Sequence, residues 1–411
     1  TYNPDFATIE GDREVINLTP WEIRFPEKRL FFQDGNEMFN TRIQTFYSRR
    51  IGDMNFGGKA IGKIGDYQFN GIFARTKENI GTNEPESNFT AVKIKRDILK
   101  SSSIGFTYTD KITESETFRT FSLDYILNLG ETWKLTGQYV GSTPGDLAAH
   151  SAWYVRFARE NNIYHYHIRY SNFGKDFVDN VNKTGFVVDD NRKEVDADIN
   201  YRFWINNTIK YIYLSSKNNL YWSQEGTPRS RIFRGSGRVY LDNSFSLEVD
   251  YRNEYKLFDK DYYNYSYEFE LGYKTDESSN AEASYEFGRN YDLDFHLFEF
   301  KTRFNLFEKL TVNYEFNHLV YVPDQESEGT NLNILGLDYF FDKDIWIRIF
   351  TQTNSSDDRL YFYGLFGWRF KPPFGAVYLI ATMDKYQKFL DNSSLRSDIV
   401  FLKFTYPITI I

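Results

Sequence analysis

The sequence alternates polar and apolar residues one by one from Glu194 onward, with a turn between each run and the next. The stretch 194–203 is the clearest example, with Val195, Ile199 and Phe203 at alternate positions among charged and amide residues. A β-strand has a period of two, so these apolar side chains share one face. The sequence offers no helix-like segments to cover so many apolar faces. We therefore expect lipid on that side and a polar lumen on the other, which predicts an all-β transmembrane antiparallel β-barrel.

The composition supports this fold class and excludes others. The chain has 411 residues with 39 Phe and 32 Tyr, residue types that suit strands and the aromatic girdles of a membrane barrel. The mean hydropathy of -0.57 fits a barrel, because half of each strand is polar. The absence of Cys excludes disulfides, and the net charge of -8 comes without the basic tract that nucleic-acid binding needs.

Short turns alternate with longer connections along the chain, as in outer-membrane barrels. Counting them predicts about 22 strands, roughly 20–24, with both termini in the periplasm. The first strand is expected at 43–51. Between Leu293 and Leu306 the alternation changes phase, and a β-bulge near Leu297 is the expected cause.

The first 42 residues lack a steady period of two. A barrel of this size encloses a lumen wide enough to need a plug. We predict two parts, a plug or linker segment at or in the lumen over 1–42, near its periplasmic mouth, and the barrel over 43–411. The alternative is that 1–42 is an ordered linker from a missing periplasmic domain.

Short motifs follow one another near the N-terminus: Asn3-Pro4-Asp5-Phe6, Val15-Ile16-Asn17-Leu18-Thr19, Phe25-Pro26-Glu27-Lys28-Arg29 and Phe46-Tyr47-Ser48-Arg49-Arg50. Together with Phe173-Gly174-Lys175-Asp176-Phe177 and Phe401-Leu402-Lys403-Phe404-Thr405-Tyr406 they resemble the DUF5916 family, although Leu30 stands where that family usually has Pro. The resemblance implies an envelope protein in which a carbohydrate-binding family 9-like β-sandwich precedes a large barrel. No residue here matches that sandwich, so its glycan-binding role is not carried over. The composition also resembles that of Bacteroidota proteins.

The N-terminal charges fall at these motifs. We expect them to dock the segment to the lumen wall through charge-assisted hydrogen bonds. Catalysis by them is less favoured, because the sequence shows no Ser-His-Asp grouping, no His-Glu-x-x-His motif and no Gly-rich phosphate loop. This plug charge network comprises Asp5, Glu10, Asp12, Glu22, Glu27, Lys28, Arg29, Arg49 and Arg50.

His165 and His167 lie two residues apart and so on one strand face, where two imidazoles could share a metal ion. Neighbouring Arg residues and the lack of an evident third ligand favour a structural role instead. Paired carboxylates could serve glycoside hydrolysis, but similar spacing recurs on every strand of a barrel, so an ion-paired wall is preferred. The predicted lumen-lining residues are Arg156, His165, His167, Arg169, Asp196, Asp198, Arg202, Glu248, Asp250, Glu268 and Glu270.

We expect no catalytic residue, no bound metal and no cofactor. The predicted function is that of a plugged or gated channel for passage or handling of a solute, glycan-related by family association, in the bacterial outer membrane. One alternative is a non-conducting scaffold that anchors a periplasmic domain or joins a larger envelope or secretion assembly. A membrane-embedded hydrolase is the least favoured. The expected partners of a monomeric barrel are the lipid bilayer, lipopolysaccharide and other envelope proteins, with no nucleic acid.

Overall fold

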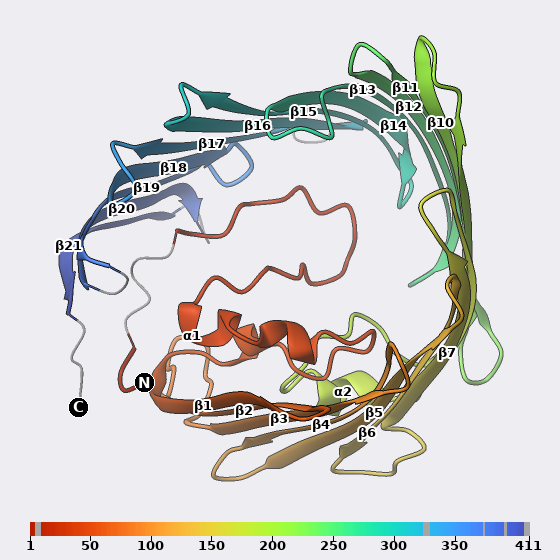
Figure 1. Ribbon diagram of the computed structural model, residues 1–411, viewed down its shortest axis with the longest axis horizontal. Helices are drawn as coiled ribbons and strands as arrows, with labels where there is room; N and C mark the ends of the chain where they lie inside the picture. The colour runs from red at the N-terminus through yellow and green to blue at the C-terminus, as the bar shows by residue number, and fades with distance from the viewer. Residues whose placement is uncertain (5–9, 324–328, 373–374, 390–392, 407–411) are drawn as a thin grey trace.

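The computed structural model describes residues 1–4, 10–323, 329–372, 375–389 and 393–406. It contains a single 21-stranded sheet that curves into a wide ring (Figure 1). The strands are β1 Met54–Ile64, β2 Tyr67–Thr76, β3 Asn88–Ile98, β4 Ser102–Ile112, β5 Thr117–Leu129, β6 Trp133–Thr143, β7 Ser151–Glu160, β8 Tyr164–Phe173, β9 Arg192–Trp204, β10 Ile209–Trp222, β11 Pro228–Leu241, β12 Phe245–Leu257, β13 Asp261–Tyr273, β14 Asn280–Asn290, β15 Leu293–Leu306, β16 Leu310–Val322, β17 Thr330–Phe340, β18 Ile345–Asn354, β19 Arg359–Lys371, β20 Gly375–Phe389 and β21 Ser393–Thr405.

Each strand pairs antiparallel with the next along the chain, so the connections fall on two rims. The long-connection rim holds the segments 77–87, 144–150 and 174–191, whereas the short-turn rim holds turns such as 65–66 and 99–101. Gly65 and Gly130 lie in short turns with positive φ, a conformation that glycine adopts at little cost. The predicted all-β antiparallel fold is therefore confirmed. Short and long connections alternate as far as β12, but beyond it the connection 274–279 on the short-turn rim is longer than 291–292 on the long-connection rim.

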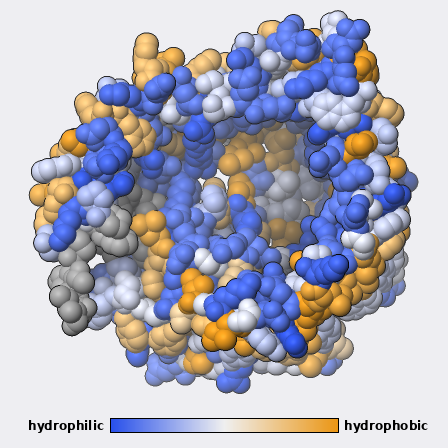
Figure 2. Space-filling model, viewed as in Figure 1, coloured by the Kyte–Doolittle hydropathy of each residue, from blue (hydrophilic) through white to orange (hydrophobic). Residues whose placement is uncertain are grey.

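The period of two sorts the side chains as predicted. On β12 and β13 the outward Leu247 and Phe269 are 54% and 49% exposed, while the inward Ser246 and Asp250 are 1% and 8% exposed. Figure 2 shows hydrophilic residues around the hollow of the ring. Among the described residues, no helix is long and apolar enough to cross a bilayer.

Residues 10–53 lie on the concave side of the sheet (Figure 1). They contain short helices, α1 Leu30–Gln33, η1 Asn36–Phe39 and η2 Ser48–Arg50, and a further helix, α2 Phe177–Val181, lies in the connection between β8 and β9. The predicted strand over 43–51 is wrong. Within 43–51, Gln44 makes a single bridge to Phe186 and Ser48–Arg50 form a 3-10 turn, because this stretch packs inside the ring and not in its wall.

The bulge expected near Leu297 is also absent: β15 keeps an unbroken register with both β14 and β16. Phe295 and Leu297 point into the ring, where they are 3% and 7% exposed and pack near Ile16 and Leu18 of the N-terminal segment. The change of phase therefore marks a switch of the apolar face along β15. Up to Leu297 the apolar residues point inward under the N-terminal segment, and from Phe298 they point outward.

The sheet has two edges, β1 and β21, which run in the same direction because the number of antiparallel strands between them is odd. Residues Thr1–Asn3 lie along the free edge of β1. Tyr2 forms an antiparallel bridge with Phe56, and Gly57 donates its N–H to the carbonyl of Thr1 at 2.9 Å. Because β1 ends at the short turn 65–66, this first strand of the wall begins at the long-connection rim.

Candidate functional site

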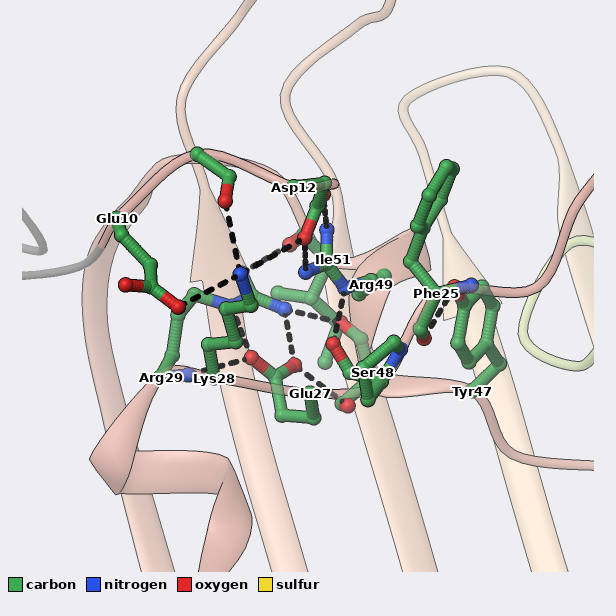
Figure 3. Close-up of polar contacts among 12 residues, drawn as sticks. Glu10, Asp12, Phe25, Glu27, Lys28, Arg29, Tyr47, Ser48, Arg49 and Ile51 are labelled. Atoms are coloured by element: carbon green, nitrogen blue, oxygen red, sulfur yellow. Dashed lines mark hydrogen bonds and ion pairs between the residues drawn. The ribbon is translucent and has the colours of Figure 1, made fainter. Parts of the chain in front are cut away.

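The N-terminal charges form a compact network inside the ring (Figure 3). Its centre is Glu27, whose side chain is 3% exposed. The Arg29 guanidinium donates two hydrogen bonds to the Glu27 carboxylate, at 2.7 and 2.9 Å, and the Arg29 backbone N–H donates a third at 2.8 Å. The Ser48 hydroxyl donates a fourth at 2.7 Å. Burial disfavours the ionised form of Glu27, but the hydrogen bonds from Arg29 and Ser48 outweigh it and lower the pKa of this carboxyl. The result is a buried, ionised pair.

Arg29 also ties two stretches of the segment together. Its guanidinium donates to the carbonyls of Ser48 and Ile51, both at 2.7 Å. Arg49 holds Asp12 with a bidentate pair at 2.6 and 2.7 Å. Such fork-to-carboxylate contacts fix both distance and orientation.

Lys28 and Arg50 complete the network. The Lys28 ammonium lies 3.6 Å from Glu10 and 3.7 Å from Asp12, and donates to the carbonyl of Gly11 at 2.8 Å. Arg50 pairs with Glu22 at 2.8 Å, near solvent. Together Glu10, Asp12, Glu27, Lys28 and Arg29 border a cavity of about 410 Å³. With Arg49, six of the nine predicted charges therefore border one cavity, Arg50 and Glu22 form a separate pair, and Asp5 lies outside the described residues.

These charges pair with one another within the segment, which differs from the docking to the wall that the sequence suggested. Contact with the wall is made by neighbours that the sequence analysis missed. Glu14 pairs with Arg359 of β19 and accepts a hydrogen bond from Asn354 at 2.7 Å. The Tyr361 hydroxyl accepts the N–H of Gly11 at 3.0 Å.

A second set of wall contacts lies on the opposite side of the ring. Gln138 of β6 holds both backbone groups of Ile43, at 2.9 Å each. Asn70 of β2 donates to the carbonyl of Gly35 at 2.8 Å. The one sequence signal for Gln138 and Asn70 was an uncharged polar residue at an inward position in the middle of a strand.

Apolar contacts accompany the polar ones. Ile16 packs against the buried inner faces of β15–β16 and of β17–β20, and Leu18 joins it on the first of these. At the other end of the segment, Phe32, Phe39 and Ile51 join Ile72 and Phe89 in a buried cluster. The segment is therefore held on two sides of the ring by hydrophobic packing.

The contacts of residues 10–22 fall near the long-connection rim. Leu18 accepts a hydrogen bond from Asn290 at the end of β14, and Trp21 contacts Phe258 in the connection between β12 and β13. If the long connections are external, as expected, these residues lie toward the external mouth of the lumen. The expected position near the periplasmic mouth stays a prediction, since it depends on which rim faces the periplasm.

The predicted lumen residues of β7–β9 also lie together. His165 contacts His167 at 2.9 Å, and Arg156 lies 3.3 Å from His165. Arg169 is 3.2 Å from both Glu194 and Asp196. Arg202 lies farther along β9, with its guanidinium 4.9 Å from the centre of the Tyr211 ring.

On β11–β13 the inward carboxylates are paired across strands: Glu248 is opposite Glu270, and Asp250 is opposite Glu268. Like charges opposite one another are destabilising unless neutralised. Arg234 lies 2.8 Å from Asp250, and Arg238 contacts both Glu248 and Glu270. The arrangement matches an ion-paired wall.

Solved structures of other proteins resemble this fold. The siderophore receptor PirA from Pseudomonas aeruginosa shares the fold, with a TM-score of 0.54 and 8% identity over 85% of this chain and 75% of that chain. The ferric yersiniabactin uptake receptor FyuA from Yersinia pestis is 8% identical with a TM-score of 0.41, over 85% of this chain and 70% of that chain. The class that the fold defines is that of a large antiparallel β-barrel.

The family described as "Domain of unknown function (DUF5916)" matches residues 1–68. The predicted resemblance to DUF5916 is therefore confirmed over the segment that carries the charge network and the first strand. No curated protein matches the chain.

Proposed function

We propose that this protein is an outer-membrane β-barrel in which the N-terminal segment plugs the lumen and gates passage of a solute. One observation carries the proposal: the inward apolar residues of the wall, such as Phe295, Leu297 and Leu319, gather where Ile16 and Leu18 of the segment pack. A water-filled lumen would leave these side chains exposed at a hydrophobic cost of about 25 cal/mol per Å². They are stable only beneath a resident cover.

The outward face supports placement in a membrane. Ile199, Leu214 and Leu271 are 58%, 48% and 48% exposed, on three different strands. An apolar belt of this kind is costly in water and matches the lipid-facing band of a barrel. The outer membrane is the bacterial membrane that holds such barrels, and lipopolysaccharide would contact this belt.

Barrel closure is part of the same proposal. Because β1 and β21 run in the same direction, one further strand between them would be antiparallel to both. Thr1–Asn3 already lie antiparallel to β1 at that position. This favours a closed barrel of about 22 strands, an even number as in bacterial barrels.

Conductance in planar bilayers tests the plug. The full chain should conduct poorly, and a variant lacking 1–40 should conduct well. A sharper version uses a disulfide between Ile16→Cys and Leu297→Cys, which is unambiguous because the chain has no Cys of its own. We expect the oxidised double variant to stay silent and the reduced one to open as often as the unmodified chain. The single variant Ile16→Cys is the control.

Silence of both the full chain and the variant lacking 1–40 would contradict the channel. That result would favour the alternative from a different class, a barrel that serves as a scaffold for an envelope assembly. Co-purification of other envelope proteins after mild detergent extraction would then identify its partners.

A further inference from the structure

One side-chain cluster in the lumen wall remains unexplained by the plug. His165 and His167 project from β8 into the ring. The next residue, Ile168, points to the opposite face of the strand, the outer one, and is 56% exposed. Asp198 lies directly opposite His167 on β9. One ligand atom from each of His165, His167 and Asp198 can be chosen so that all lie within 4.8 Å of one another.

The two imidazoles are held in a specific orientation. His165 Nδ1 lies 3.1 Å from Glu160, and His167 Nε2 lies 2.7 Å from Asp196. A carboxylate accepts a proton-bearing nitrogen, so these contacts assign the protons to His165 Nδ1 and His167 Nε2. The unprotonated nitrogens, His165 Nε2 and His167 Nδ1, then face each other at 2.9 Å.

Two lone pairs at this separation repel unless a proton, the neighbouring Arg156 guanidinium or a metal ion lies beside them. The arrangement in which each histidine donates its outer N–H to a carboxylate is also the usual second shell of zinc ligands. Asp198, the third residue of the cluster, also has an unused acceptor. Asp198 has a buried carboxylate oxygen with no hydrogen-bond partner in the described chain, which is costly for an acceptor that has no other role.

Competing charges surround the cluster. Arg156 Nη2 lies 3.3 Å from His165 Nε2, and Lys217 is opposite Asp198 on β10. Arg169 is already engaged by Glu194 and Asp196. Arg156 also reaches Glu160 at 3.8 Å, so its guanidinium has a second acceptor when it leaves His165.

We propose that His165, His167 and Asp198 bind a divalent transition cation, with Zn²⁺ the best match to two nitrogens and one carboxylate oxygen. Three protein ligands leave the fourth tetrahedral position for water or for a donor atom of a solute in the lumen. The site belongs to the wall and does not depend on the plug.

Isothermal titration of the full chain, purified in detergent and stripped with a chelator, tests the proposal with ZnCl₂. We expect saturation at one ion per chain and no comparable binding of MgCl₂. Asp198→Asn and His167→Ala should each weaken Zn²⁺ binding at least about 100-fold, beyond the roughly 10–100-fold loss typical of an outer partner. His318→Ala, on β16 and hydrogen-bonded to Asn331, is the matched control and should bind as the unmodified chain does.

Two further variants separate a metal site from a merely structural cluster. Glu160→Gln should weaken binding about tenfold while the visible spectrum of the Co²⁺ form stays tetrahedral. Arg156→Gln should tighten binding several-fold, because it removes the competing cation. Migration of unheated samples in detergent gels checks that each variant is folded. Equal Zn²⁺ affinity in the unmodified chain, Asp198→Asn and His167→Ala would overturn the proposal.

Discussion

The inner faces of β15–β19 and of β11–β13 belong to one sheet and yet differ in what lies against them. The first carries Leu297, Leu332 and Phe350, all buried, beside the N-terminal segment. The second carries the opposed carboxylates and their arginines, which satisfy one another within the wall. The difference teaches that inward apolar residues occur where another part of the chain covers them, and that an uncovered wall must neutralise its own charges.

The largest expected effect comes from Glu27→Ala. This change tests whether the order of the N-terminal segment depends on the ion pairs within it. The change leaves the Arg29 guanidinium without its carboxylate in a site where the two side chains are 15% and 3% exposed. We expect a loss of about 3–5 kcal/mol in the free energy that orders the segment. Hydrogen exchange of residues 25–51 measures it.

Glu22→Ala is the matched control, because Glu22 is 55% exposed and pairs with Arg50. A surface pair of this kind contributes about 0–1 kcal/mol. If Glu22→Ala and Glu27→Ala had equal effects on exchange, the buried pair would not be what orders the segment.

Leu297→Ala tests the covered wall directly. Removing this buried side chain should cost about 2–3 kcal/mol, the lower part of the range for such cavities, and should release residues 10–18. Limited proteolysis of the segment is the measurement. Leu247→Ala, on the outward face and 54% exposed, should leave the proteolysis pattern unchanged.

Acidification should loosen the segment. The pKa of Glu27 is lower in the folded chain than its ordinary value of 4.5, so its stabilising contribution is fully present above pH 4.5 and is lost as the pH falls through the folded pKa. We expect faster proteolysis of residues 25–51 by an acid-active protease at about pH 3.5 than at about pH 5.5. In Glu27→Gln this difference should largely disappear.

Arg238→Ala should have the smallest effect on the segment. It removes a neutralising charge from Glu248 and Glu270, in a wall region away from Ile16 and Leu18. Segment protection should change by less than about 1 kcal/mol, while a variant that also lacks 1–40 should become more selective for cations. A large change in segment protection would break the proposed separation of the two regions.

Much of the fold followed from the alternation alone, since a period of two fixes which side chains share a face. It gave the strands from Glu194 onward and the ion-paired carboxylates on the inner face. The same rule failed at 43–51, where Ile43, Phe46 and Ile51 alternate imperfectly and serve a cover instead of a strand. It failed again at Leu297, where an inner apolar residue looked like a bulge.

The sequence predicted which residues belong to the candidate site, but not which partners they contact. Matching motifs brought Glu27, Arg29 and Arg49 to attention, yet their partners within the segment depend on how the chain folds back on itself. Glu14, Gln138 and Asn70 were missed because a single polar residue carries no periodic signal. Asp198 was predicted to line the lumen, but its place beside His165 and His167 depends on strand register, which a sequence without an alignment leaves open.

The amino-acid sequence by itself determined that the chain is a large antiparallel sheet with one apolar and one polar face, because side-chain direction alternates with every residue along a strand. Only the tertiary structure decided that the N-terminal segment covers the apolar inner wall near the long-connection rim, because contacts between residues hundreds of positions apart depend on the curvature and register of the whole sheet.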